Sequence, residues 1–130
     1  MSRFTTRAVL AGALLIVAVT AAACGSAEGA APASQGPVDP NAVKVIASGQ
    51  QFTTKDVTAP AGAGFQLVFD SRTGDPHDIV IAKDGSDPVL TSDVFSGPAT
   101  KTFQVPALAA GTYTFRCEVH PGMTGTLTVR

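Results

Sequence analysis

The stretch GTYTFRCEVHPGMTGTLTV, residues 111–129, decides the fold of this 130-residue chain. Apolar and polar side chains alternate on both sides of its centre, a period of two that is typical of strands with one buried face. The Pro-Gly pair at its centre is typical of a tight turn. The stretch therefore predicts two strands joined by a turn. Its inward-facing residues are predicted to be Tyr113, Phe115, Cys117, Met123, Leu127 and Val129.

The preceding residues have the same organisation. Short apolar segments are separated by Gly, Pro, Asp and Ser clusters about every 8 to 12 residues, which is typical of an antiparallel β-sandwich or barrel. In GFQLVFDS, residues 64–71, the apolar residues share one face, and HDIVIA, residues 77–82, is apolar on both faces after its first residues, like a covered strand. SDPVLTSDVFSG, residues 86–97, lacks alternation and is expected to be a loop with at most one helical turn.

Residues 1–23 resemble a secretory signal peptide. Arg3 and Arg7 precede an apolar stretch over residues 8–23, and small residues come directly before Cys24. This order is typical of a cleaved signal. An uncleaved anchor is the alternative, but sixteen residues fall short of the roughly 18 to 20 that span hydrocarbon.

Cys24 adds a prediction about the membrane. AAAC, residues 21–24, resembles the lipobox of bacterial lipoproteins, in which the cysteine is lipidated and becomes the new N-terminus. That family usually has Leu where this chain has Ala21, so ordinary cleavage after Ala23 is the alternative. We expect lipidation of Cys24, which would hold the protein on the outer face of the bacterial cell membrane.

Residues 24–41 are expected to form a flexible tether. They are mostly small and polar, contain several prolines and show no apolar periodicity that could pack a core. The remaining residues, 42–130, are enough for one small domain but not for two with independent cores.

The charge and size of the chain limit its partners. Residues 1–23 hold two of the nine basic residues and none of the ten acidic ones, so their removal leaves a formal charge of −3. Net negative charge disfavours nucleic acid as a partner. A monomeric domain of this size presents only a small patch, so complexes with protein partners are expected to be weak and transient.

The residues that could bind a metal fall into two short stretches. His77 stands at the start of a predicted strand, whereas Cys117, His120 and Met123 share the predicted turn with two residues in each gap. An extended chain advances about 3.3 to 3.6 Å per residue, so only a folded-back loop brings these three to one ion. Any one of these residues alone would be interpreted as an ordinary core or surface residue. Together they supply two imidazoles, a thiolate and a thioether, a ligand set that favours copper. Zinc usually takes four strong ligands instead.

At these residues the chain resembles a known family. GTYTFRCEVHPGMTGTLTV and PHDIVI are similar to the small blue copper proteins, the cupredoxins, and the spacing of Cys117, His120 and Met123 resembles that of amicyanin. The resemblance covers roughly residues 42–130. It implies an all-β fold, an eight-stranded Greek-key β-sandwich.

The resemblance also implies roles for individual residues. His77, Cys117 and His120 would be the strong ligands of one type 1 copper ion, and Met123 the weak axial one. The exposed edge of the His120 ring would be the port for electrons, with a docking surface around it formed by Val119, Pro121 and Pro76.

One residue departs from the family pattern. Where cupredoxins usually carry Asn after the first His, this chain has Asp78. An ionised carboxylate can accept a backbone N–H there but cannot donate one. Its negative charge would favour Cu(II) over Cu(I), so we expect Asp78→Asn to raise the reduction potential.

The predicted function is that of a membrane-tethered type 1 copper protein, not an enzyme, which shuttles single electrons between redox partners outside the cytoplasm. The main alternative is a copper-trafficking lipoprotein that delivers copper to a cuproenzyme, but such sites are usually more exposed and richer in Met. A catalytic copper subunit would need an open coordination position or a second copper centre, and the sequence suggests neither.

Overall fold

The computed structural model describes residues 31–34 and 36–130, and the alternating segments of the sequence form its strands. The strands are β1 (Val43–Ala47), β2 (Asp56–Ala59), β3 (Phe65–Ser71), β4 (Val80–Ala82), β5 (Leu90–Thr91), β6 (Ala99–Val105), β7 (Gly111–Arg116) and β8 (Thr124–Val129).

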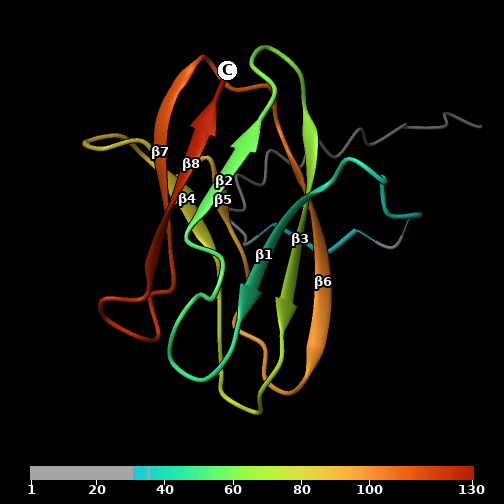
Figure 1. Ribbon diagram of the computed structural model, residues 1–130, viewed down its shortest axis with the longest axis vertical. Helices are drawn as coiled ribbons and strands as arrows, with labels where there is room; N and C mark the ends of the chain where they lie inside the picture. Colours follow the sequence, from blue (N-terminus) through green and yellow to red (C-terminus); the bar gives the residue numbers. More distant parts are fainter. Residues whose placement is uncertain (1–30, 35) are drawn as a thin grey trace, which may run out of the picture.

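The eight strands form two sheets that face each other (Figure 1). One sheet has the order β1-β3-β6 and the other the order β2-β8-β7-β4-β5. β1 pairs with β3 and β2 with β8 in parallel, whereas the remaining pairs are antiparallel. Strands that are neighbours in a sheet are often distant in sequence, as in a Greek key. The predicted all-β, eight-stranded sandwich is thereby confirmed.

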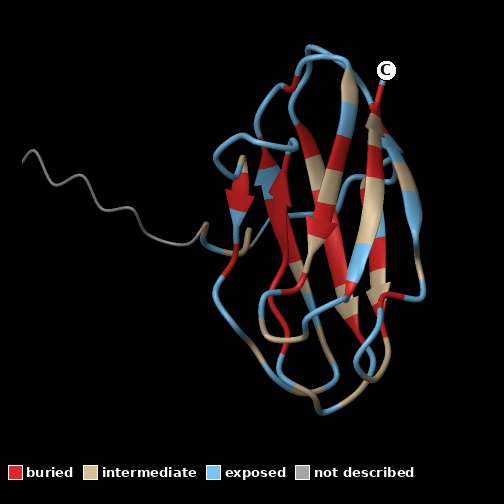
Figure 2. Ribbon diagram, turned by 90° about the vertical axis from the view of Figure 1, so that its left-hand side faces the viewer, coloured by how far each residue is buried: buried red, intermediate tan, exposed pale blue. Residues whose placement is uncertain are grey.

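The core lies between the sheets, where the buried residues of both layers meet (Figure 2). The predicted alternation holds, because Phe65, Leu67 and Phe69 on β3 are all buried, as are Tyr113 and Phe115 on β7. The segment from residue 77 to residue 82 is buried throughout, as its continuous apolar character predicted.

The stretch 86–97 differs from its prediction. It contains no helical turn; instead it forms β5 and two isolated bridges, Ala31 with Ser92 and His77 with Phe95. Two-residue strands leave no periodic pattern in a sequence, so alternation could not reveal them. No helix in the part of the chain that the structure describes is long and apolar enough to cross a membrane.

Some of the described residues before β1 contact the domain. The Ala31 N–H donates to Thr91 O, and further along the Asp39 N–H donates to the Gln66 side chain. The prediction of a flexible tether over residues 24–41 did not foresee these hydrogen bonds to the domain. The predicted signal peptide, residues 1–23, and the predicted lipidation site, Cys24, lie outside the described residues.

Candidate metal centre

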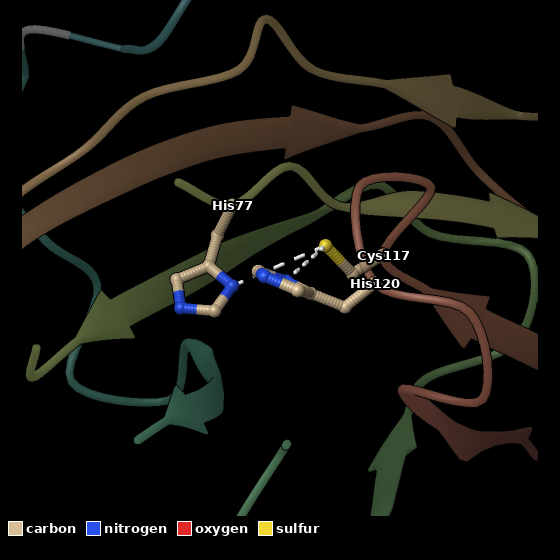
Figure 3. A group of neighbouring side chains, drawn as sticks. All are labelled: His77, Cys117 and His120. Atoms are coloured by element: carbon tan, nitrogen blue, oxygen red, sulfur yellow. Dashed lines mark hydrogen bonds between the residues drawn. The ribbon is translucent and has the colours of Figure 1, made fainter. Parts of the chain in front are cut away.

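Three of the predicted ligands come together at one end of the sandwich (Figure 3). His77 precedes β4, whereas Cys117 and His120 belong to the loop between β7 and β8. The Cys117 sulfur lies 3.9 Å from Nδ1 of His77 and 3.7 Å from Nδ1 of His120. One ligand atom from each residue lies within 4.8 Å of the other two. The fold therefore joins residues forty positions apart into one cluster.

Local hydrogen bonds fold the ligand loop back on itself. The Cys117 N–H donates to Met123 O, and the Met123 N–H donates to His120 O, both at 3.0 Å. In the turn from His120 to Met123, Pro121 occupies the second position and Gly122 the third, where Gly122 has a φ of 86°. Proline there and a positive-φ glycine next are the signature of a type II turn. The predicted Pro-Gly turn is confirmed. It folds the loop back, so that Cys117, His120 and Met123 lie close together although they are three residues apart in sequence.

Met123 lies at the base of the same loop. Its side chain is 2% exposed, and its backbone carbonyl accepts the Cys117 N–H. The residues predicted to surround the electron port are more accessible: Val119 and His120 are half-buried, whereas Pro121 and Pro76 are exposed.

His77 is held by its backbone and by aromatic neighbours. Its N–H donates to Phe95 O at 2.9 Å, and its carbonyl accepts the Phe95 N–H at 2.8 Å. Its ring meets the ring of Phe69 edge-on, with centroids 6.2 Å apart. The sequence prediction did not include Phe95 in the site, because the segment around it shows no strand pattern.

Burial affects the two kinds of ligand in opposite ways for metal binding. Burial lowers the pKa of the His77 imidazole, and the neighbouring His120 lowers it further, whereas the acidic neighbours Asp75 and Asp78 act weakly in the opposite direction. Burial raises the pKa of the Cys117 thiol. A neutral imidazole keeps a lone pair for a metal, and binding must displace the thiol proton.

The two sulfur–nitrogen separations match those of a trigonal metal site. With metal–sulfur bonds of about 2.3 Å and metal–nitrogen bonds of about 2.0 Å, angles of 120° separate sulfur and nitrogen by about 3.7 Å. The observed separations are 3.7 and 3.9 Å. One thiolate and two imidazoles in this arrangement, with a methionine beside them, form the donor set of electron-transfer copper sites.

A hydrogen bond of Asp78 connects the segment that holds His77 with the loop that holds Cys117. Its carboxylate is 4% exposed, and its Oδ1 accepts the backbone N–H of Glu118 at 2.8 Å. Asp78 follows His77, and Glu118 follows Cys117, so this one bond links the two ligand segments. The sequence predicted that the Asp78 carboxylate can accept a backbone N–H, and it accepts that of Glu118.

Comparison with known proteins agrees with this geometry. A family described as cupredoxin-like domain matches residues 12–129. Plastocyanin A/B of Petroselinum crispum is 33% identical over an 88-residue alignment that covers 62% of this chain and 89% of that protein.

Two solved structures share the fold. Reduced auracyanin from Roseiflexus castenholzii aligns with a TM-score of 0.60 at 22% identity, over 67% of this chain and 94% of auracyanin. A reduced variant of amicyanin aligns with a TM-score of 0.56 at 21% identity, over 72% of this chain and 86% of amicyanin.

Proposed function

Because the chain belongs to the cupredoxin-like family, we propose that it carries single electrons between redox proteins and that His77, Cys117, His120 and Met123 hold its copper. Its cofactor is one type 1 copper ion. When bound, that ion supplies a one-electron couple between Cu(II) and Cu(I). The observation that carries the proposal is the cluster of one buried thiol and one ring nitrogen from each of two histidines, all within 4.8 Å of one another.

The surrounding residues keep the ligands in place. The loop from Cys117 to Met123 is closed by two backbone hydrogen bonds, and Asp78 fixes the Glu118 amide beside it. A ligand set that moves little between two oxidation states lowers the barrier to electron transfer. Burial of Cys117, at 4% exposure, keeps water away from the thiolate.

The proposed electron port is the half-buried ring of His120. Electrons would enter and leave through its edge, and the neighbouring Val119, Pro121 and Pro76 would form the docking surface. Two of these three side chains are exposed, which supports contact with a partner. A patch this small suits a brief encounter rather than a stable complex.

The proposal extends to location. The charged, apolar and small residues that end at Cys24 support export and lipidation, with the domain on the outer face of the bacterial cell membrane. We propose that the protein acts there as a monomer and meets its redox partners transiently.

Copper delivery is the less favoured function. A delivery site must expose its metal to the receiving protein, whereas His77 is 0% and Met123 2% exposed. Of the four proposed ligands only His120 is half-buried, and the described residues contain a single methionine, which suits retention of copper.

The proposed function is tested by adding Cu(II) to the full chain and recording visible absorption and EPR spectra. We expect an intense thiolate-to-copper band that disappears in Cys117→Ser. Cys24→Ser is the matched control, because it removes the other cysteine of the chain and should keep the band. A colourless, readily exchanged copper complex would contradict the proposal and favour copper delivery.

A further inference from the structure

Residues 31–34, here called the N-terminal clasp, connect the open edges of the two sheets. The Ala31 N–H donates to Thr91 O on β5 at 2.7 Å, and the Ser34 N–H donates to Thr102 O on β6. β5 is the last strand of the five-stranded sheet, and β6 is the last strand of the three-stranded sheet. Four residues thus join both layers on one side of the sandwich.

The clasp pairs with the first residue of a segment that supports His77, because Ala31 forms an isolated bridge with Ser92. Residues 92–95, here called the brace, follow β5 directly. Ser92 accepts the Ile79 N–H on its Oγ at 2.9 Å and donates its own N–H to Ile79 O at 3.1 Å. Phe95 exchanges two backbone hydrogen bonds with His77, at 2.8 and 2.9 Å. The brace therefore runs alongside residues 77–79 and fixes their backbone.

The ring of His77 is fully buried, and one of its two nitrogens lacks a hydrogen-bond partner among the described residues. A histidine that binds a metal usually donates its second ring N–H to a carbonyl or carboxylate, which fixes the ring. Nε2 of His77 is buried and has no such partner among the residues that the structure describes. The ring rests on Phe69, which in turn meets the ring of Phe95 at 5.3 Å between centroids. The brace thus restrains His77 both through the backbone and through aromatic packing.

The clasp faces the outer side of the brace. Ala31, Pro32 and Ala33 line a cavity of about 340 Å³ together with Phe95 and other residues of the brace and of β6. The backbone hydrogen bonds of the clasp go to Thr91, directly before the brace, and to Thr102 on β6. Ala31 and Ala33 also pack against the core. Loss of the two hydrogen bonds would free the clasp from the strand that leads into the brace.

We propose that the N-terminal clasp is a positioning element of the metal centre. By holding the brace, residues 31–34 fix the orientation of His77, although they lie more than forty positions before it. The effect on copper rests on the proposed function, whereas the effect on the backbone around His77 does not.

The first test uses the full chain without copper. In Ala31→Pro/Ser34→Pro both N–H donors are removed, because proline has none. We expect amide hydrogen exchange of His77 and Phe95 to accelerate at least tenfold, with the amides of the β3–β6 ladder within threefold of the original rates. Equal acceleration throughout, or no change at His77 and Phe95, would overturn the proposal.

The matched control exchanges the two side chains but keeps both donors. Ala31→Ser/Ser34→Ala has the same composition as the original chain and should leave the exchange of His77 and Phe95 within twofold. If the proline variant does not fold, exchange in the unchanged chain decides. Amides of Ala31 and Ser34 protected at least a hundredfold support the clasp, and unprotected amides refute it.

The second test uses the copper-loaded full chain. We expect the proline variant to lose copper to a chelator at least threefold faster and to show altered copper hyperfine splitting in EPR. The control should match the original chain in both. Unchanged release and spectra, despite faster exchange at His77, would refute the positioning role. A chain with no blue copper band before any substitution would instead refute the proposed function.

Discussion

Asp78→Asn removes one negative charge beside the proposed copper site without removing its main contact. The Oδ1 of Asp78 accepts the Glu118 N–H at 2.8 Å, and an asparagine oxygen can accept the same bond. The variant therefore separates the effect of charge from the effect of geometry. Because Cu(II) carries one more positive charge than Cu(I), loss of the carboxylate destabilises Cu(II) more, and the reduction potential should rise.

The size of the rise follows from the position of Asp78 between two ligand segments. For a carboxylate taken to lie about 6.5 Å from the metal, with an effective dielectric constant of about 20, one charge contributes about 2.5 kcal/mol. For a one-electron couple this corresponds to about 100 mV. The carboxylate is 4% exposed, so solvent screening is weak.

Glu118→Gln is the matched control. It removes the same charge beside Cys117, but its side chain is 55% exposed. For a carboxylate taken to lie about 10 Å from the metal in a dielectric constant near 80, the expected shift is only about 20 mV. Protein-film voltammetry of the two variants measures both shifts. A change below 20 mV in Asp78→Asn, a change downward, or equal shifts in the two variants would refute the electrostatic argument.

Two further predictions concern stability. Gly125→Ala should lower the free energy of unfolding by about 3 kcal/mol, because its Cβ would lie 2.2 Å from Cζ of Phe115; Gly74→Ala, with open space around it, should change it by less than about 0.5 kcal/mol. Urea denaturation measures both, and equal stability of the two variants would disprove the packing argument. Tyr113→Phe should cost about 1 kcal/mol in the same assay, because the Tyr113 hydroxyl donates to Ala109 O at 3.0 Å; an unchanged midpoint would show that this bond contributes nothing.

The strands with clear alternation could be predicted from the sequence, for a physical reason. A strand that buries one face must repeat apolar residues with a period of two, and β3 and β7 do so. The cluster of His77, Cys117 and His120 could also be predicted from the sequence, because these residue types are scarce and stand near predicted strand ends. The Pro121-Gly122 pair supplied the turn.

The supporting residues could not be predicted in the same way. β5 has two residues, and the bridge between His77 and Phe95 pairs single residues, so neither leaves a period in the sequence. Which strands become neighbours also depends on the packing of the whole chain. The parallel pairing of β1 with β3 and the contact between Ala31 and Thr91 arise only when the two layers meet.

The N-terminal clasp sets where the domain would be held on a surface. If Cys24 carries the proposed lipid, the chain already contacts the domain at Ala31, seven residue steps further on, which span at most about 25 Å. The seventeen steps to Asn41 would span up to about 60 Å. The point of attachment then lies on the flank of the sandwich, beside β5 and β6. An electron carrier held so close to its lipid anchor would reach only partners that project close to the same membrane. The distance that the domain can move from the membrane would then depend on the hydrogen bonds of residues 31–34.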